Sequence, residues 1–325
     1  MVEPSSVLIT GGAGYIGSTL VHLLLDAGYS VRVLDSLRYG GESLLGAWTH
    51  PSFNLVSSDI RDRGAVRRAL QDIETVVHLA AIVGDPACAR QPNEAMEVNL
   101  CASQQLLDEC RRSGAKRFVF ASTCSNYGKP VNPTVHLDEQ SELTPVSLYA
   151  ETKAQFEKTL RESGSSDRLA VTTLRFSSLF GVSRRMRFDL TLNEFALDMI
   201  VKKRLLVFGE SSWRPYLHVY DAARAVCLVL ANPEKVTGQV YNVGTNRQNY
   251  RKVDLLEIMR KHLTDAEIDF TTSRQDLRNY CVCFDKIRRD LNFDATRTLE
   301  YGARELVRLL QSGVIRQPEA EVYRN

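Results

Sequence analysis

Short apolar runs alternate with longer helical patterns along the first half of the chain, and this alternation restricts the fold more than any other feature. The runs predict six strands, at 7–9, 31–34, 54–56, 75–79, 118–120 and 171–174. Helical segments lie between them, and three of these end at a glycine: 15–27 at Gly28, 93–113 at Gly114 and 147–163 at Gly164. Glycine commonly ends a helix because it adopts the left-handed conformation without a side-chain clash. Strands that alternate with helices predict βαβ units, and therefore an α/β fold with a doubly wound parallel sheet.

The alternation becomes less regular after Gly181. Arg-rich and aromatic segments, such as 184–188 and 213–216, mix there with short helices. We therefore predict a sheet domain over 1–180 and a smaller mixed region over 181–325 that faces the substrate. Segments such as 215–245 are expected to return to the first domain, because 240–243 has the pattern of a late strand.

Composition and charge exclude several classes of function. The 325 residues include 44% hydrophobic residues, enough for a large α/β domain and a smaller partner. Lys and Arg number 41 and Asp and Glu 39, and a net charge of +2 gives little attraction for nucleic acid or an anionic membrane. No apolar run approaches the roughly 18 residues of a membrane span, and the first residues lack a signal-peptide pattern. We expect a cytoplasmic protein that binds neither nucleic acid nor membrane.

Cysteines and histidines give no sign of a metal site. The seven cysteines form no CxxC pair, and their odd number suits a reducing compartment. Cys281 and Cys283 stand two apart in a strand-like run without a nearby histidine, so we interpret them as core residues. The six histidines are far apart and form no HExxH motif. We predict no bound metal.

A glycine-rich turn follows the first strand and opens the first helix. Gly12, Gly14 and Gly17 fit the pattern G-x-G-x-x-G, which brings backbone N–H groups close to a pyrophosphate at a helix N-terminus. The second strand ends at Asp35, eighteen residues after Gly17, where a carboxylate can accept hydrogen bonds from the adenosine ribose. This combination predicts a Rossmann-type dinucleotide site.

Asp35 would repel a ribose 2′-phosphate and so favours NAD over NADP, whereas Arg38 either receives such a phosphate or is a solvated charge.

A second pattern, YAETK, places Tyr149 and Lys153 four residues apart, so that both lie on one face of a helix. An adjacent cation favours the phenolate and lowers the pKa of a tyrosine. We therefore predict that Tyr149 acts as an acid and base near neutral pH. The same spacing also occurs in ordinary surface Tyr–Lys pairs, and the glycine turn upstream favours the catalytic interpretation.

Together these motifs resemble those of the extended short-chain dehydrogenases/reductases that act on nucleotide-activated sugars. The likeness covers nearly the whole chain. The matching motifs are TGGAGYIG at 10–17, Asp35, Asp59-Ile60, HLAA at 78–81, Asn99, STCSNYG at 122–128, YAETK at 149–153, Arg175 and RPYLHVYD at 214–221. The resemblance implies NAD as the cofactor of residues 1–180 and a nucleoside-diphosphate sugar as the substrate of residues 181–325.

The resemblance also implies roles for single residues. The cofactor contacts would be Gly11, Gly14, Tyr15, Ile16, Gly17, Asp35, Asp59, Ile60, Ala80, Ala81, Asn99, Tyr149 and Lys153. Lys153 would hold the nicotinamide ribose, and Thr123 would hydrogen-bond the reacting sugar oxygen. The family's chemistry begins when a sugar hydroxyl, usually at C4, loses its proton to the tyrosine and a hydride to the nicotinamide, which leaves a transient ketosugar.

The residues after Thr123 depart from part of the family. Relatives that eliminate water usually carry Asp-Glu there, and those that decarboxylate a uronic acid keep the Glu, but this chain has Cys124 and Ser125. The difference argues against ordinary 4,6-dehydration and against decarboxylation. Cys124 is a candidate catalytic residue, because some relatives use a cysteine in this loop and a tuned thiol can exchange protons with a carbanion. The alternative is that Cys124 packs in the core.

Cations are expected where the substrate diphosphate binds, because arginine can hold phosphate with two hydrogen bonds. Arg214 and Arg278 match two family arginines of this kind, and Asn193 matches an asparagine that contacts the pyrophosphate. Ser178 stands where galactose epimerases carry asparagine, and Asp85 either binds a sugar hydroxyl or starts a turn. The predicted substrate residues are Asp85, Ser125, Ser178, Asn193, Arg214 and Arg278.

The favoured function is an NAD-dependent epimerase, which would remove a hydride from C4 and return it to the opposite face of the ketosugar. One alternative is a NAD(P)H-dependent ketosugar reductase that uses the same Thr123, Tyr149 and Lys153, and another is an atypical dehydratase that uses Cys124. A non-catalytic dinucleotide sensor is disfavoured because Tyr149 and Lys153 are both present.

The resemblance further implies a homodimer through helices 93–113 and 147–163. An apolar stripe on the first of these, Met96, Leu100, Leu107 and Cys110, faces either the partner or the sheet.

Overall fold

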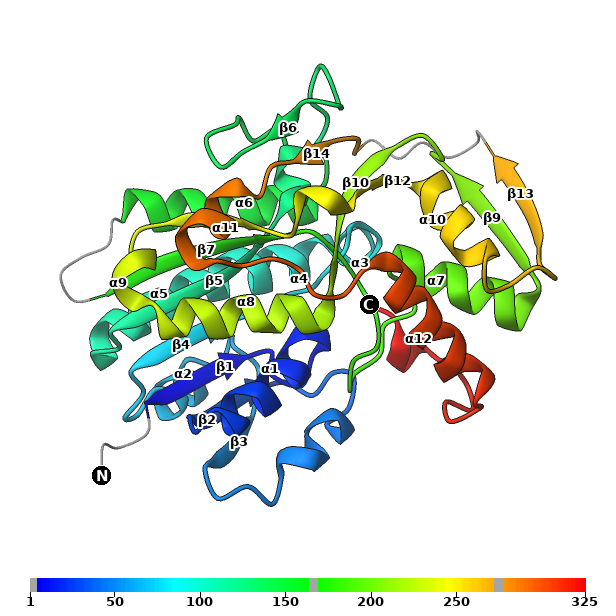
Figure 1. The fold of residues 1–325 in the computed structure, drawn as a ribbon. Coiled ribbons are helices and arrows are strands. Elements are labelled where there is room, and N and C mark those ends of the chain that lie inside the picture. The colour runs from blue at the N-terminus through cyan, green and yellow to red at the C-terminus, as the bar shows by residue number, and fades with distance from the viewer. Residues whose placement is uncertain (1–4, 164–168, 272–277) are drawn as a thin grey trace.

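The computed structural model describes residues 5–163, 169–271 and 278–325, and the expected helix stop at Gly164 lies outside them. Its centre is a sheet of seven parallel strands in the order β11-β7-β5-β4-β1-β2-β3 (Figure 1). The strands are β1 (Ser6–Thr10), β2 (Ser30–Asp35), β3 (Phe53–Ser57), β4 (Thr75–His78), β5 (Arg117–Thr123), β7 (Ala170–Phe176) and β11 (Val240–Val243). All six predicted strands and the late strand are present, so the predicted doubly wound parallel sheet is confirmed.

Helices cover both faces of this sheet. α1 (Tyr15–Asp26) and α8 (Val219–Ala231) pack on one face, and α2 (Arg63–Ala69), α5 (Ser103–Ser113) and α6 (Leu148–Glu162) pack on the other (Figure 1). Successive side chains of a strand point to opposite faces, so Val7 and Ile9 join the core beneath α1 while Leu8 joins the core beneath α2. Both faces are apolar for this reason, as a parallel sheet requires.

Two of the predicted helix ends have the expected geometry. Gly28 and Gly114 follow α1 and α5 with φ of +85° and +80°. The predicted helix over 93–113 is interrupted, however: α4 (Pro92–Met96) leads into the π-helical turn η2 (Glu97–Ala102), and only then does α5 begin. π-helical turns often occur at functional sites.

The remaining elements complete the loops above the sheet and a smaller lobe. Around the sheet they are η1 (Glu42–Ala47), α3 (Asp85–Arg90), η3 (Cys124–Tyr127), β6 (His136–Leu137), α9 (Pro233–Val236), η5 (Asn246–Gln248), β14 (Cys281–Val282) and α11 (Asp285–Leu291). In the smaller lobe they are β8 (Ser178–Phe180), α7 (Thr191–Leu197), η4 (Asp198–Lys202), β9 (Arg204–Phe208), β10 (Trp213–His218), β12 (Asn249–Arg251), α10 (Lys252–Arg260), β13 (Glu267–Thr271), α12 (Leu299–Gln311) and η6 (Glu321–Tyr323). The strands pair as β12-β10-β8, β13-β9 and β14-β6.

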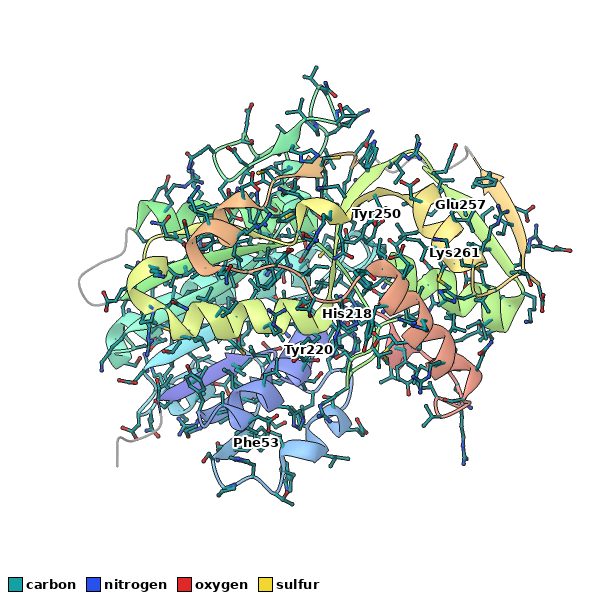
Figure 2. The ribbon with its side chains drawn as sticks, in the orientation of Figure 1. Phe53, His218, Tyr220, Tyr250, Glu257 and Lys261 are labelled. Atoms are coloured by element: carbon teal, nitrogen blue, oxygen red, sulfur yellow. The ribbon has the colours of Figure 1, made fainter. Side chains whose placement is uncertain are left out.

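The smaller lobe has its own core, formed chiefly by α7, α10 and α12. Figure 2 shows His218 and Tyr220 where α8 meets this lobe, and Tyr250, Glu257 and Lys261 within it. His218 Nε2 lies 2.5 Å from Glu305 Oε1 on α12, and the Arg297 guanidinium lies 3.9 Å from the centre of the Tyr220 ring. Among the described helices, none is long and apolar enough to cross a membrane.

Hydrogen bonds join the smaller lobe to the start of α1. The Tyr15 hydroxyl donates to the Gly181 carbonyl (2.5 Å), and the Ser183 hydroxyl donates to the Tyr15 carbonyl (2.6 Å). Asn193 donates to the Tyr15 hydroxyl and the Arg187 carbonyl and accepts from the Gly181 N–H. We call this group of contacts the latch.

Candidate active site

A cleft of about 610 Å³ opens at the carboxyl ends of the central strands. In a parallel sheet this edge is where ligands bind, because the connections after neighbouring strands diverge there. The cleft is lined by the glycine turn, the ends of β2, β4 and β5, the start of α6, and segments of the smaller lobe. Of the residues predicted from the sequence, it brings together Gly11, Gly14, Tyr15, Ile16, Gly17, Asp35, Asp59, Ile60, Ala80, Ala81, Thr123, Ser125, Tyr149, Lys153, Ser178, Arg214 and Arg278.

The glycine turn is packed too closely for side chains at two positions. Gly11 has a φ of +76°, and a Cβ there would lie 2.7 Å from the Ala80 nitrogen. A Cβ on Gly17 would overlap the Gly11 carbonyl oxygen. The close packing leaves the N-terminus of α1 facing the cleft, so its backbone N–H groups are available to an anionic ligand.

Asp35 is held at the edge of this turn. Its carboxylate accepts the N–H groups of Ala13 (2.9 Å) and Leu37 (2.8 Å). Burial raises its pKa, and these two hydrogen bonds oppose that rise. Arg38, for which the sequence left two interpretations, forms an ion pair with Glu94 (3.1 Å) and hydrogen-bonds Gln91.

Asn99 is buried and hydrogen-bonds the loop after β4. Its side chain is 1% exposed, accepts the N–H of Ile82 (2.8 Å) and donates to the carbonyl of Ile82 (3.0 Å). These bonds fix the loop after β4, whose residues Ala80 to Gly84 line the cleft. These bonds give Asn99, which lies in the π-helical turn, a role in positioning this loop.

Thr123, Tyr149 and Lys153 meet where β5 ends and α6 begins. The Tyr149 hydroxyl hydrogen-bonds the Thr123 side chain. The Lys153 ammonium donates to the carbonyl of Ala121 (2.9 Å) and lies 4.7 Å from the centre of the Phe120 ring. Ser147 begins α6 by accepting the Ala150 N–H, which directs the first turn of the helix, and with it Tyr149, toward the cleft.

The predicted lowering of the Tyr149 pKa is wrong for the protein alone. Burial raises the pKa of Tyr149, and the main opposing charge is Arg187 and not Lys153. Burial also lowers the pKa of Lys153 to about 8, a shift that the charges of Cys88 and Glu157 oppose only in part. The helical spacing predicted that both residues lie on one face of the helix, but it could not show that this face is buried.

Cys124, the candidate catalytic residue after Thr123, lies in the core, which favours its packing interpretation. The side chain is 0% exposed, packs in the core beneath α1 and α8, and donates its S–H to the Arg175 carbonyl (3.2 Å). Burial raises the pKa of this thiol, which disfavours the reactive thiolate. Thr123, at the end of β5, lines the cleft, whereas Cys124, at the start of η3, does not.

Both arginines predicted to bind the substrate line the cleft. Arg214 packs over the Tyr280 ring, with 5.0 Å from its guanidinium carbon to the ring centre, and Ser125 hydrogen-bonds the Tyr280 side chain.

Arg278 forms an ion pair with Asp85 (3.1 Å). The other Asp85 oxygen accepts the Ser147 hydroxyl (2.7 Å). Asp85 therefore begins α3 and holds two side chains, which favours the turn interpretation over sugar binding.

Asn193, for which the resemblance implied a pyrophosphate contact, is not among the residues that line the cleft. Its side chain is 0% exposed and both its polar atoms take part in the latch. It therefore orders the segment from Gly181 to Arg187 and does not itself offer a free group to a pyrophosphate.

Sequence reasoning singled out no role for Arg185 and Arg187, although both are buried and line the cleft. Arg187 donates to both oxygens of Asp189 (3.0 and 2.6 Å). The Arg-rich run 184–188 was the available signal, but its spacing did not show which arginines point inward. The described residues contain no cluster of three His, Cys, Asp or Glu side chains suited to a metal.

Comparison with known proteins places this cleft in a family. A family model described as the NAD dependent epimerase/dehydratase family matches residues 7–244, well over half of the chain. The chain belongs to this family. The family's fold and NAD dependence agree with the predicted resemblance, and the protein is an enzyme of the epimerase type.

Individual relatives of the epimerase/dehydratase chain cover most of its length. A UDP-glucose 4-epimerase of Halalkalibacterium halodurans is 31% identical over 287 residues, 81% of this chain and 83% of the relative. A trifunctional UDP-glucose 4,6-dehydratase/UDP-4-keto-6-deoxy-D-glucose 3,5-epimerase/UDP-4-keto-L-rhamnose-reductase of Arabidopsis thaliana is 32% identical and covers 78% of this chain and 38% of that protein. The crystal structure of a UDP-glucose 4-epimerase of Thermotoga maritima with UDP-glucose has a TM-score of 0.85 at 28% identity and covers 95% of this chain and 99% of that one.

The cleft of this family member fits NAD. The N-terminus of α1 faces the cleft behind close-packed glycines, Asp35 is fixed at the end of β2, and Lys153 stands beside Tyr149. The turn would hold the pyrophosphate, Asp35 the adenosine ribose, and Lys153 the nicotinamide ribose.

Proposed function

We propose that this protein is an epimerase that inverts C4 of a nucleoside-diphosphate sugar, with residues 1–180 binding NAD and residues 181–325 supplying most of the substrate site. The observation that carries the proposal is the meeting of Thr123, Tyr149 and Lys153 in the same cleft as the glycine turn. Arg214 and Arg278 line the other end, where a diphosphate would lie. UDP-glucose is the first substrate to test, because the relatives above are named for it.

Bound NAD supplies the acceptor for a hydride and the donor that returns it. As the phenolate, Tyr149 would take the proton of the sugar C4 hydroxyl to become the phenol and later return that proton, while the Thr123 hydroxyl would hold the same oxygen. Tyr149 is protonated in the protein alone, because burial raises its pKa, so it needs a nearby positive charge to work as a base. Arg187 opposes the rise in the Tyr149 pKa without cancelling it, so the remaining positive charge would come from the oxidised nicotinamide ring of bound NAD.

The two residues after Thr123 disfavour dehydration. An elimination at C5 and C6 needs an acid and a base at those carbons. Cys124 is buried in the core and Ser125 carries no carboxylate, so neither residue supplies them. A ketosugar reductase would use the same Thr123 and Tyr149 and is separated from an epimerase by whether cofactor is consumed.

We also propose a cytosolic homodimer. The seven cysteines are all free, which suits a reducing compartment. On the helices implied in the dimer, Leu107 and Cys110 face the sheet, but Met96 and Leu100 remain partly exposed. We expect light scattering after gel filtration to give twice the chain mass of 36.5 kDa, and a monomer at micromolar concentration would contradict the dimer.

The test is to incubate the purified protein with UDP-glucose or UDP-galactose without added cofactor and to follow the sugar by proton NMR. We expect each to convert to the other until equilibrium, with no net reduction of NAD. A 4-keto-6-deoxy product would indicate a dehydratase, and turnover only with stoichiometric NADPH would indicate a reductase. Either outcome would overturn the proposal.

A further inference from the structure

Arg185 comes from the smaller lobe but lies against the dinucleotide side of the cleft. Its backbone N–H donates to the Ser18 hydroxyl on α1 (3.3 Å). Its guanidinium carbon lies 4.1 Å from the centre of the Tyr39 ring, in the loop after β2. Arg185 therefore contacts both α1, through its backbone, and the loop after β2, through its side chain, and these two elements frame a dinucleotide in this fold.

The Arg185 guanidinium is buried without a full set of partners. The residue is 6% exposed, and one terminal nitrogen donates to the Arg324 carbonyl (3.2 Å). Its Nε is buried and, among the residues that the structure describes, has no hydrogen-bond partner. A buried donor that lacks an acceptor destabilises the folded protein, and more strongly when the group is charged. The geometry therefore calls for an acceptor from a bound ligand.

The neighbouring side chains do not fill this need. Both oxygens of Asp35 accept backbone N–H groups, and Arg187 has its own carboxylate in Asp189. Burial, and after it the charge of Arg187, lower the pKa of Arg185 to about 10, so it remains charged at neutral pH. A buried cation with a free N–H, beside a helix N-terminus that also favours anions, suits a phosphate group.

We propose that Arg185 binds the pyrophosphate of NAD from the substrate side of the cleft and thereby slows release of the cofactor. The proposal rests on the NAD dependence of the family. It makes the segment from Gly181 to Arg187, which the latch ties to α1, a part of the cofactor site. Because an epimerase reuses one cofactor molecule, such a contact would keep the NAD in place between turnovers.

The experiment measures release of NADH. The protein is loaded with NADH and chased with excess NAD, and the loss of NADH fluorescence gives the release rate for wild type, Arg185→Gln and Arg185→Lys. Arg184→Gln is the matched control, because Arg184 is the exposed neighbour on the same segment. Displacement of NADH by ADP-ribose, adenosine or NADP then shows which part of the dinucleotide is affected. Circular dichroism and thermal melting report whether each variant is folded.

We expect Arg185→Gln to speed NADH release by about tenfold or more and to weaken ADP-ribose by a similar factor, since a hydrogen bond to a charged group contributes about 1.5–3 kcal/mol. Adenosine, which lacks phosphate, should bind within twofold of wild type, as should every ligand of Arg184→Gln. Should Arg185→Gln not fold, Arg185→Lys tests the same contact, because it keeps the charge but loses the fork, and release should still be several times faster. Unchanged release from the folded variants would overturn the proposal, as would weaker binding of NADP alone. If wild type binds no NADH, the proposed function fails as well, and that result differs from a failure confined to Arg185.

Discussion

At the scale of single residues, the proposed mechanism depends on the Tyr149 hydroxyl changing its protonation state. Tyr149→Phe removes the hydroxyl group but keeps the ring, so we expect epimerisation to fall by about 10²–10⁴-fold while NAD binding is retained. The measurement is turnover by NMR beside dinucleotide content. Tyr29→Phe, on a partly buried tyrosine packed against the core, is the control and should keep full activity. Near wild-type turnover in Tyr149→Phe would contradict the assignment.

Cys124 gives a second prediction at this scale. Because the thiol packs in the core and binds the Arg175 carbonyl, Cys124→Ala should lower the free energy of unfolding by about 1 kcal/mol and leave turnover within a few-fold of wild type. Chemical denaturation and the NMR assay check both values. Loss of solvent deuterium incorporation beside the keto carbon in this variant would show that Cys124 does act as an acid.

The lowered pKa of Lys153 predicts that the stability of the folded protein depends on pH. Its pKa is about 8 in the folded protein and 10.5 as an ordinary lysine, so the folded chain binds fewer protons between these values. The free energy of unfolding that depends on Lys153 is therefore constant below about pH 8, rises between 8 and 10.5, and is constant above that, by up to about 3 kcal/mol in all. The measurement compares wild type with Lys153→Met by denaturation across this range. Lys158→Met, exposed on the same helix, should show no such difference, and a flat comparison for Lys153 would refute the prediction.

At the scale of elements, the π-helical turn η2 fixes the loop after β4 through Asn99. Asn99→Ala removes both bonds to the Ile82 backbone and leaves the Ile82 N–H without its acceptor, so we expect the free energy of unfolding to fall by about 1–3 kcal/mol and NAD to bind more weakly. Asn99→Asp keeps the acceptor for the Ile82 N–H and should be the milder change. Thermal melting and NADH titration test this, and an Asn99→Ala protein with unchanged NADH affinity would show that the loop does not need the turn.

The elements also show what the sequence could predict. Alternating apolar residues such as Val7, Leu8 and Ile9 face two cores, so local pattern was sufficient to find the sheet. The π-helical turn was not predictable, because Glu97–Ala102 has an ordinary helical pattern and its geometry comes from the bonds of Asn99 to a distant loop. The same distinction, between local sequence pattern and contacts between distant segments, applies to the candidate active site. The glycine turn, Asp35, Thr123 and Tyr149 have fixed positions relative to a strand end or helix start, whereas Arg185, Arg187 and Asn193 reach the cleft region through contacts between the lobes.

At the scale of the whole molecule, the latch ties the smaller lobe to α1. Asn193→Ala removes bonds to Gly181, Arg187 and Tyr15 in a fully buried setting, so we expect a loss of about 2–4 kcal/mol in the free energy of unfolding, and faster NADH release because Arg185 lies on the same segment. Denaturation and the fluorescence chase check the two effects. Asn132→Ala, on the surface, should change neither. A stable Asn193→Ala protein would mean that the lobes are held together elsewhere.

The proposed function requires the protein to keep NAD through a closed catalytic cycle. This requirement is tested by denaturing freshly purified protein and identifying the released dinucleotide by chromatography. We expect NAD and NADH together at close to one molecule per chain. Protein that emerges empty and then binds NADPH in preference to NADH would contradict the closed cycle, and would favour a ketosugar reductase.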